Sequence, residues 1–306
     1  MDIISGGVQH MEKKLIKNKF PINVIYEGDC RKVMQDTTKF PDACVDVIVT
    51  SPPYADKRAK FYDSVHPDKY VDWFLPISKE MHRVLKDSGS LILNIKEHTR
   101  NGERDTYVLN LILALKKQGW YWIEEYCWYK KNSFPGRWPN RFRDAWERCL
   151  HFSKDKKFSM YQDAVKVPIG SWAEKRFKSM GSNDFVRHIS KTNGSLGRNV
   201  SNWLHKKKVL PHNVIVFEEE HYVSNVIEFA TVCYNKKHSA AFPLELPSWF
   251  IRLFTKKNDV VLDPFLGSGT TAYAALALGR NYIGIEIDKG FIKDAEETIG
   301  ELKGNK

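Results

Sequence analysis

The feature that most constrains the fold is a strand, a glycine-containing turn, a helix and a second strand near the end of the chain. Asp259 to Asp263 is short and apolar enough to form a buried strand, and it runs into Asp263-Pro264-Phe265-Leu266-Gly267-Ser268-Gly269-Thr270-Thr271. A helix of small residues over 270–278 then leads to a strand over 281–288 that carries acids at its end. A strand, a helix and a strand in this order predict neighbouring parallel strands with a ligand at their carboxyl ends.

The turn itself has the features of a nucleoside-binding loop. Gly267 and Gly269 let the backbone come close to a ligand, and the free N–H groups at the start of the next helix favour a carboxylate or a phosphate. Glu286, at the end of the second strand, is placed to accept hydrogen bonds from both hydroxyls of a ribose. No lysine follows the glycines, which disfavours a nucleoside triphosphate. Because the turn has only two glycines, a redox dinucleotide is also a less suitable ligand.

A second constrained stretch is Thr50-Ser51-Pro52-Pro53-Tyr54, which follows an apolar, β-branched run over 43–49. Each proline fixes its own φ and restricts the residue before it, so the carbonyls of Ser51 and Pro52 point outward in a nearly fixed geometry. Such carbonyls suit an amino group, and the flat ring of Tyr54 offers a surface on which a base can stack. A strand that simply ends in a proline turn is the structural alternative.

Alternating strand and helix patterns elsewhere predict an α/β fold. Strands are expected over 23–29, 89–95, 120–128 and 147–153, and helices over 70–85, 107–117, around 249–254 and over 290–302. Together with the two stretches above, these elements predict a doubly wound, mostly parallel sheet. The polar stretch 55–68 has no clear period and is interpreted as a loop over the site.

Composition narrows the class of protein. No apolar run among the 306 residues reaches membrane-spanning length, and the first residues lack the pattern of a signal peptide, so a cytoplasmic location is expected. The five cysteines are widely spaced and fit neither a disulfide framework nor a zinc cluster. The net charge is +11, and residues 151–217 hold thirteen Lys and Arg against four Asp and Glu, an excess of nine. This concentration favours a polyanionic partner over a merely solvated face.

Taken together, the two constrained stretches resemble the amino-group DNA methyltransferases, in the class whose catalytic tetrapeptide precedes the cofactor motif. The resemblance implies a Rossmann-like fold with S-adenosylmethionine as the cofactor, and a catalytic motif formed by Ser51, Pro52, Pro53 and Tyr54. Asp29 falls where the family has an acid that contacts the adenine amine of the cofactor. The implied cofactor-binding residues are Asp29, Asp263, Pro264, Phe265, Gly267, Ser268, Gly269, Thr270 and Glu286.

The resemblance also implies a division of the chain. Residues 1–20 are expected to be an N-terminal arm, 21–154 the catalytic half of the methyltransferase domain, 155–235 a basic target-recognition region, and 236–306 the cofactor-binding half. Basic side chains set among aromatic rings can serve phosphates and bases together. The residues expected to contact DNA are Arg137, Arg141, Arg143, Lys206, Lys207 and Lys208.

The implied reaction is direct methyl transfer to an exocyclic amine of a base that has left the duplex. Hydrogen bonds to the Ser51 side chain and the Pro52 carbonyl would localise the lone pair of the amine, and no metal is required. Methylation at carbon 5 of cytosine needs a cysteine, typically after proline, and the sequence has no Pro-Cys dipeptide. Within the family, serine at the first motif position favours N4 of cytosine, with N6 of adenine as the alternative.

The resemblance implies double-stranded DNA as the partner and no association with a membrane. Whether a cognate restriction endonuclease acts on the same site stays open, as do the target sequence and the choice between monomer and homodimer. Two other functions are weighed: a non-catalytic DNA-binding protein on the same scaffold, and methylation of RNA or of protein amides, which shares the Pro-Pro-Tyr turn. The intact motifs disfavour the first, and the large basic segment disfavours the second.

Overall fold

The structure, a computed structural model, contains one eight-stranded sheet with the strand order β1-β12-β11-β2-β3-β7-β6-β10. It describes residues 20–55, 65–130, 142, 144–169, 175, 178–179, 208–211, 227–228 and 242–304. The strands of the sheet are β1 (Val24–Glu27), β2 (Val45–Thr50), β3 (Leu85–Ile95), β6 (Tyr121–Tyr129), β7 (Trp146–Ser153), β10 (Ile227–Glu228), β11 (Val260–Asp263) and β12 (Asn281–Glu286).

The direction of the strands brings distant segments to one edge of the sheet. Strands β1, β12, β11, β2 and β3 pair in parallel, whereas β7 runs antiparallel to both β3 and β6. Strand β6 therefore points the same way as β2. The carboxyl ends of these parallel strands and the first residues of β7 consequently share an edge.

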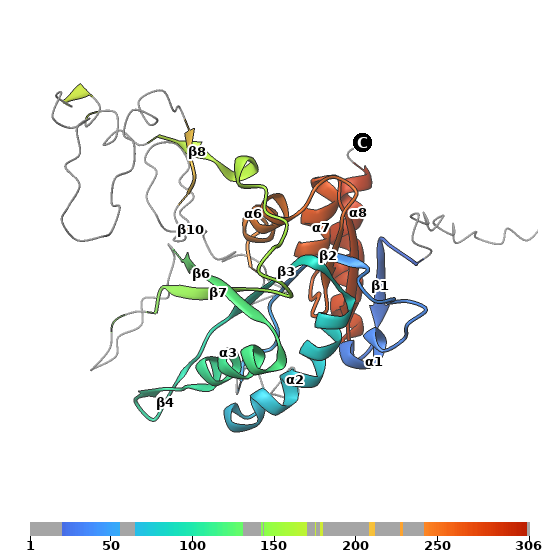
Figure 1. Cartoon of the computed structure of the whole chain (residues 1–306). Coiled ribbons are helices and arrows are strands. Elements are labelled where there is room, and N and C mark those ends of the chain that lie inside the picture. The colour runs from blue at the N-terminus through green and yellow to red at the C-terminus, as the bar shows by residue number, and fades with distance from the viewer. Residues whose placement is uncertain are drawn as a thin grey trace, which may run out of the picture.

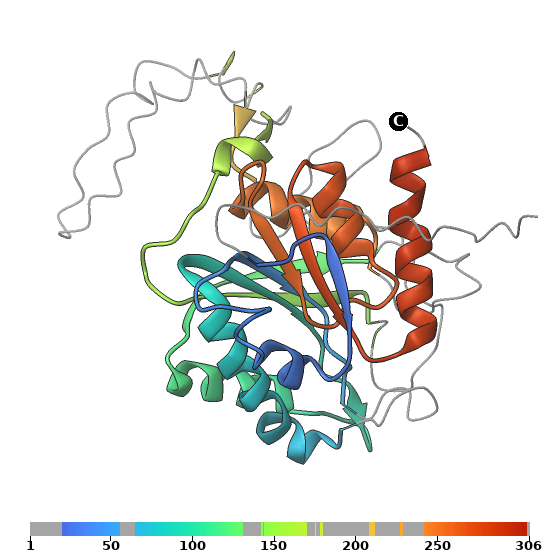
Figure 2. The same cartoon turned by 90° about the vertical axis from the view of Figure 1, so that its right-hand side faces the viewer.

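Helices cover both faces of the sheet (Figures 1 and 2). One layer contains α1 (Cys30–Met34), α2 (Pro67–Val84) and α3 (Tyr107–Gln118), and the other contains α6 (Glu245–Phe254), α7 (Thr270–Ala277) and α8 (Lys289–Gly304). Figure 2 shows the sheet between the blue-green helices of the first layer and the orange-red helices of the second.

The core follows from the two-residue period of the strands. Val47 and Val49 of β2 pack in the cluster that contains α6 and α7, whereas Ile48 packs in the cluster that contains α2 and α3. On β11 the same alternation places Val261 in the first cluster and Leu262 in the second. Strands buried on both faces read as continuous apolar runs, which is the pattern seen in the sequence.

The predicted fold class, a doubly wound and mostly parallel sheet, is confirmed. Gly119 ends α3 in the left-handed conformation with φ of 110°, as expected of a helix stop signal. Helix α2 continues through Pro76, and Phe20, the last residue of the predicted arm, is buried in the core. The sequence patterns did not predict the antiparallel direction of β7, because period and composition do not encode strand direction.

Several short elements were also not predicted. These are the hairpin of β4 (Thr99–Arg100) and β5 (Glu103–Arg104), the 3₁₀ turn η1 (Gln162–Val165), the pair of β8 (Val167–Pro168) and β9 (Lys208–Val209), and the edge strand β10. Two-residue strands are too short to show any hydrophobic period. Among the described helices, none has the length and apolarity needed to cross a membrane.

Candidate functional site

The two constrained stretches lie on adjoining strands at the centre of the sheet. Val47 and Ile48 of β2 pair with Val261 and Leu262 of β11. Thr50 and Asp263 each follow the last buried apolar residue of their strand. The Thr50 hydroxyl donates to Oδ1 of Asp263 at 2.6 Å. The proline turn and the glycine turn therefore lie side by side, although 213 residues separate Thr50 from Asp263 in the chain.

Asp263 holds the two turns together. Its side chain is 2% exposed, and besides Thr50 it accepts hydrogen bonds from the Phe265 N–H at 3.0 Å and the Thr271 hydroxyl at 2.7 Å. Burial raises the pKa of Asp263 to about 6, which means that it outweighs the opposing effect of these donors. Because all three donors belong to the protein, the Asp263 side chain holds the glycine turn in place and connects it to Thr50.

The raised pKa predicts how stability depends on pH. Because the folded-state pKa of Asp263, about 6, lies above its ordinary value of 3.8, the folded protein binds more protons than the unfolded chain between these values. Stability is therefore lost as pH rises through this window, by up to about 3 kcal/mol from this group. We expect Asp263→Asn to lack this contribution. Denaturant unfolding of both proteins from pH 4 to pH 7, without cofactor, checks this, and parallel pH profiles would contradict it.

The turn after β11 needs its glycines for two different reasons. Gly267 and Gly269 have φ of 54° and 88°, in the left-handed region that favours glycine. A Cβ at Gly269 would lie 2.9 Å from the Cβ of Ala295 on α8. A Cβ at Gly267 would meet no atom of the described residues within 4 Å. The backbone at Gly267 therefore borders open space that a ligand can enter, whereas Gly269 lets the loop pack on α8.

Substitution of the second glycine should cost more than backbone strain alone. Gly269→Ala combines an unfavourable φ with overpacking against Ala295, for an expected loss of about 2–4 kcal/mol. Gly102→Ala is the matched control, since Gly102 has φ of 84° but a Cβ added there would meet no atom within 4 Å in the described part of the chain. About 1–2 kcal/mol is expected for this variant. Chemical denaturation of the two variants measures the difference; equal losses would mean that the contact with Ala295 is unimportant.

Glu286 joins the glycine turn to the end of β12. One carboxylate oxygen accepts from the Gly267 N–H at 2.8 Å, and the other accepts from the N–H groups of Ile287 at 2.9 Å and Asp288 at 3.0 Å. The side chain is 6% exposed. A carboxylate has about four acceptor sites, so three donors leave room for a hydroxyl group. Glu286 therefore lies beside the open space at Gly267 with part of its acceptor capacity unused.

Asp29 lies at the same edge. The Gly28 N–H donates to the Glu286 carbonyl at 2.9 Å, which places the end of β1 against the end of β12. One oxygen of Asp29 caps α1 by accepting from the N–H groups of Arg31 at 2.8 Å and Lys32 at 3.3 Å. The loop after β1 thus brings Asp29 to the side of the glycine turn that faces away from the proline turn.

The proline turn is fixed at three points. Pro52 is buried, and the Pro53 carbonyl accepts from the hydroxyl of Tyr70 on α2 at 2.9 Å. The Ser51 hydroxyl lies 3.4 Å from the Tyr54 hydroxyl. The Tyr54 hydroxyl in turn donates to Oε2 of Glu147 at 2.7 Å, and it lies 3.2 Å from Oδ1 of Asn94. The turn is therefore held by contacts to both the helix layer and the sheet.

Three residues that the motifs did not include contribute to this arrangement. Glu147, the second residue of β7, forms an ion pair with Lys130, and Asn94 of β3 donates to Glu147 at 3.3 Å. Burial and the Glu147 charge raise the pKa of Tyr54 well above its ordinary value, so the hydroxyl stays protonated. No local pattern in the sequence pointed to Glu147, because its strand also contains Arg148 and His151.

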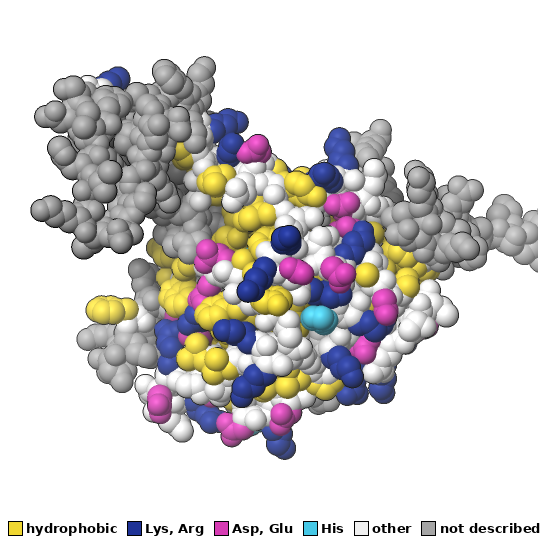
Figure 3. Space-filling model, viewed as in Figure 1, with side chains coloured by type: hydrophobic (Ala, Val, Ile, Leu, Met, Phe, Trp, Pro, Cys, Tyr) yellow, Lys and Arg dark blue, Asp and Glu magenta, His cyan; other side chains and the backbone are white. Residues whose placement is uncertain are grey.

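Most of the residues predicted to contact DNA lie outside the described residues. These are Arg137, Arg141, Arg143, Lys206 and Lys207. Lys208 is described, and it is exposed on β9. On the face in Figure 3, basic and acidic side chains are intermixed over the described surface. Among the cysteines, Cys44 and Cys149 are buried and Cys127 is half-buried.

The geometry suits a reaction between a nucleoside-like ligand and an amino group. A carboxylate with spare acceptor capacity and an open backbone surface lie at the ends of β11 and β12. A hydroxyl and an aromatic ring lie at the end of β2, the neighbouring strand. Among the described residues there is no group of three His, Cys, Asp or Glu side chains that could hold a metal ion. The carboxylate, the open backbone surface, the hydroxyl and the ring together support the alignment of two organic molecules.

Comparison with known proteins agrees with this geometry. A family model described as DNA methylase matches residues 45–297. The Type II methyltransferase M.PvuII of Proteus hauseri is 27% identical over 288 residues, covering 88% of this chain and 81% of that protein. The DNA adenine methyltransferase YhdJ of Escherichia coli (strain K12) is 26% identical over 275 residues, covering 88% and 80%.

Solved structures share the fold. The PvuII DNA methyltransferase, described as cytosine-N4-specific, superposes with a TM-score of 0.63 and 21% identity, covering 94% of this chain and 93% of that one. A DNA modification methylase of Thermus thermophilus, determined with S-adenosyl-L-methionine, gives a TM-score of 0.54 and 21% identity, covering 90% and 93%. At these identities the likeness concerns the fold alone.

Proposed function

Because this chain belongs to the family of amino-group DNA methylases, whose model spans residues 45–297, we propose that it methylates the exocyclic N4 of cytosine in a specific DNA sequence. It is a DNA amino-methyltransferase, and its cofactor is S-adenosylmethionine. The observation that carries the proposal is the hydrogen bond between Thr50 and Asp263, which joins the Ser51–Tyr54 turn to the glycine turn at the centre of the sheet.

The residues of the glycine turn fit this cofactor. The open space at Gly267 admits a ligand close to the backbone, and Glu286 retains acceptor capacity for a ribose hydroxyl. We assign the other predicted cofactor-binding residues to the same loop and its flanks: Asp29, Asp263, Pro264, Phe265, Ser268, Gly269 and Thr270. Within this set Asp263 acts from inside the loop, through its bonds to Thr50 and Thr271. When bound, the cofactor supplies an electrophilic methyl group.

The residues of the proline turn fit the acceptor. An exocyclic amine is a weak nucleophile because its lone pair is conjugated with the ring. The Ser51 hydroxyl and the Pro52 carbonyl accept its N–H groups and so localise that lone pair, while the ring of Tyr54 stacks on the base. The Pro53 carbonyl accepts from Tyr70, and we assign the Pro52 carbonyl to the amine. Orientation of the two reactants supplies much of the rate.

Serine at position 51 favours cytosine N4 over adenine N6. The similar proteins include both M.PvuII, whose structure is described as cytosine-N4-specific, and the adenine methyltransferase YhdJ, so adenine N6 is the second candidate. To test this, purified protein is incubated with labelled S-adenosylmethionine and unmethylated DNA, and the digested nucleosides are identified by mass spectrometry. N4-methyldeoxycytidine is the expected product. N6-methyldeoxyadenosine would replace the first proposal by the second.

The contact with DNA is assigned to two basic segments, one around Arg137 to Arg143 and one around Lys206 to Lys208. We place target recognition in residues 155–235, between a catalytic half over 21–154 and a cofactor-binding half over 236–306. The excess of nine basic residues over 151–217 supports this division, because phosphate contacts supply most of the affinity for DNA. A restriction endonuclease acting on the same sequence is the second proposed partner.

A further inference from the structure

The hydroxyl of Tyr54 is bound by a carboxylate that none of the motifs contains. Glu147 accepts from this hydroxyl at 2.7 Å through Oε2, while Oε1 pairs with the ammonium group of Lys130. Glu147 is 7% exposed. An ionised carboxylate so deeply buried is costly unless it is paired and hydrogen-bonded, and here each oxygen has a partner.

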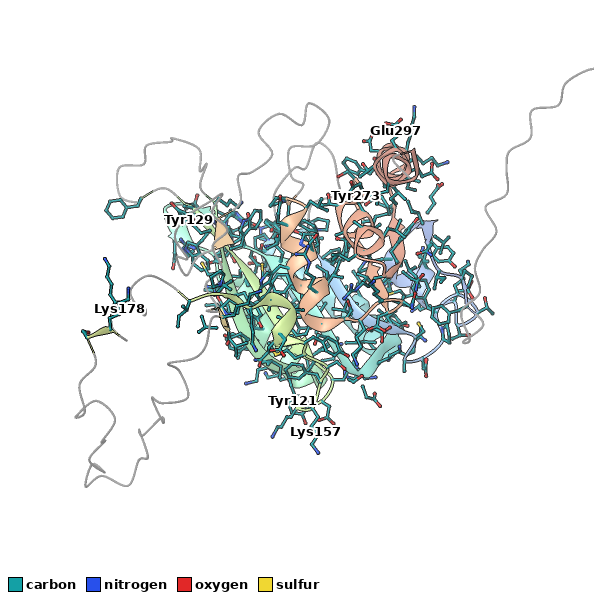
Figure 4. The ribbon with its side chains drawn as sticks, turned by 90° about the horizontal axis from the view of Figure 1, so that it is seen from above. Tyr121, Tyr129, Lys157, Lys178, Tyr273 and Glu297 are labelled. Atoms are coloured by element: carbon teal, nitrogen blue, oxygen red, sulfur yellow. The ribbon has the colours of Figure 1, made fainter. Side chains whose placement is uncertain are left out.

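Glu147, Lys130 and Tyr54 come from three separate segments. Glu147 lies opposite Trp128 in the β6–β7 register, and Lys130 follows the last residue of β6. Figure 4 shows Tyr121 and Tyr129 at opposite ends of β6, with Tyr129 marking the end at which Lys130 lies. The backbone N–H of Lys130 also donates to the Ala145 carbonyl at 2.6 Å. This bond connects the segments before and after residues 131–143.

We propose that Glu147, neutralised by Lys130, is a positioning residue that fixes the ring of Tyr54 in the orientation needed to stack on the target base. This inference rests on the proposed transfer to a stacked base. It adds a functional role for two residues outside the two motifs. The proposal concerns only the orientation of the ring, so it holds for cytosine and for adenine alike.

The physical reason is the freedom of an unrestrained tyrosine. Two prolines fix the backbone before Tyr54, but the ring can still turn about its own two side-chain torsions. A hydrogen bond from the hydroxyl to a buried strand residue fixes the far end of the ring. A base that stacks on the fixed ring does not have to order it, so the ordering cost is met on folding and not on binding.

Lys130 keeps Glu147 in the form that this role needs. Burial alone would raise the pKa of Glu147, but the charge and hydrogen bond of Lys130, together with the Tyr54 hydroxyl, lower the pKa below its ordinary value. An ionised carboxylate only accepts hydrogen bonds, so the direction of the bond from Tyr54 is fixed. Asn94, which donates to Oε2 at 3.3 Å, supports the same orientation from β3.

The first test is Tyr54→Phe, which removes the hydroxyl and keeps the stacking ring. The pair of Glu147 and Lys130 stays intact, so the variant should fold. A lost charge-assisted hydrogen bond predicts a fall in kcat of about 10- to 100-fold. The KM for S-adenosylmethionine should change less than about twofold. Methyl transfer is measured on an unmethylated DNA that the unmodified protein methylates, with cofactor stoichiometry and Tm as checks of folding.

The second test is Glu147→Gln, which keeps the shape and one acceptor oxygen. We expect an intermediate fall in kcat, because Gln still accepts from the Tyr54 hydroxyl but leaves Lys130 without its counter-charge. Combined with Tyr54→Phe, this substitution should cost little more than Tyr54→Phe alone. Glu125→Gln is the matched control, since Glu125 pairs with Arg148 on the same two strands but does not touch Tyr54. Its kcat should match that of the unmodified protein.

Three results would overturn the proposal: full kcat in Tyr54→Phe, a loss in Glu147→Gln that adds in full to that of Tyr54→Phe, or an equal loss in Glu125→Gln. If Glu147→Gln does not fold, Tyr54→Phe decides alone. A failure of the proposed cytosine specificity appears separately, in the nucleoside formed by the unmodified protein, because the comparisons among variants use only the amount of methyl transferred.

Discussion

Replacing Tyr54 by alanine is expected to lower turnover about 100-fold or more while leaving the affinity for S-adenosylmethionine within about threefold. The ring supplies base stacking, which is worth about 1–3 kcal/mol, and it also orients the amine toward the methyl donor. Tyr54 follows β2, whereas the cofactor loop follows β11, so the substitution should not disturb cofactor binding. Single-turnover methyl transfer and isothermal titration of the cofactor measure the two quantities.

A matched control for this substitution is Tyr121→Ala. Tyr121 starts β6 at the edge of the sheet opposite the site, is 42% exposed and lies near Lys156, which is 5.8 Å from the centre of its ring. Loss of this tyrosine should leave turnover unchanged within about twofold, since an exposed contact of this kind is worth about 0.5–1 kcal/mol of stability. If Tyr54→Ala turned over as fast as this control, the stacking role would be wrong.

Glu286→Ala is expected to weaken cofactor binding about 100-fold. It removes the acceptor for a ribose hydroxyl, and a charge-assisted hydrogen bond is worth about 1.5–3 kcal/mol. It also removes the acceptor of the Gly267, Ile287 and Asp288 N–H groups, so the cofactor loop loses support and Tm should fall. Isothermal titration well below the unfolding transition separates the loss of affinity from the loss of stability.

Glu27→Ala serves as the control for this position. Glu27 pairs with Glu286 in the β1–β12 register, but its side chain is exposed and lies 3.4 Å from the exposed Lys289. An exposed ion pair of this kind contributes about 0–1 kcal/mol, so neither Tm nor cofactor affinity should change appreciably. Unaltered cofactor binding in Glu286→Ala would remove Glu286 from the cofactor site.

The candidate site divides into residues that motifs reveal and residues that only packing reveals. Ser51, Tyr54, Gly267 and Glu286 were predicted because each residue type suits a chemical role at the end of a strand. Glu147, by contrast, is 93 residues from Tyr54 in the chain, and no local pattern links the two. Their hydrogen bond exists only because β7 runs antiparallel to β3 and so begins at the edge where β2 ends.

The sequence by itself determined the fold class, the order of most strands and helices along the chain, and the two turns that meet at the sheet's centre. Apolar period, glycine and proline act over a few residues, so they can be read from short stretches. The tertiary structure decided which strands are neighbours, and so which buried polar side chains form hydrogen bonds. The bonds of Asp263 to Thr50 and of Glu147 to Tyr54 depend on strand order and direction, which are set by the packing of the whole sheet.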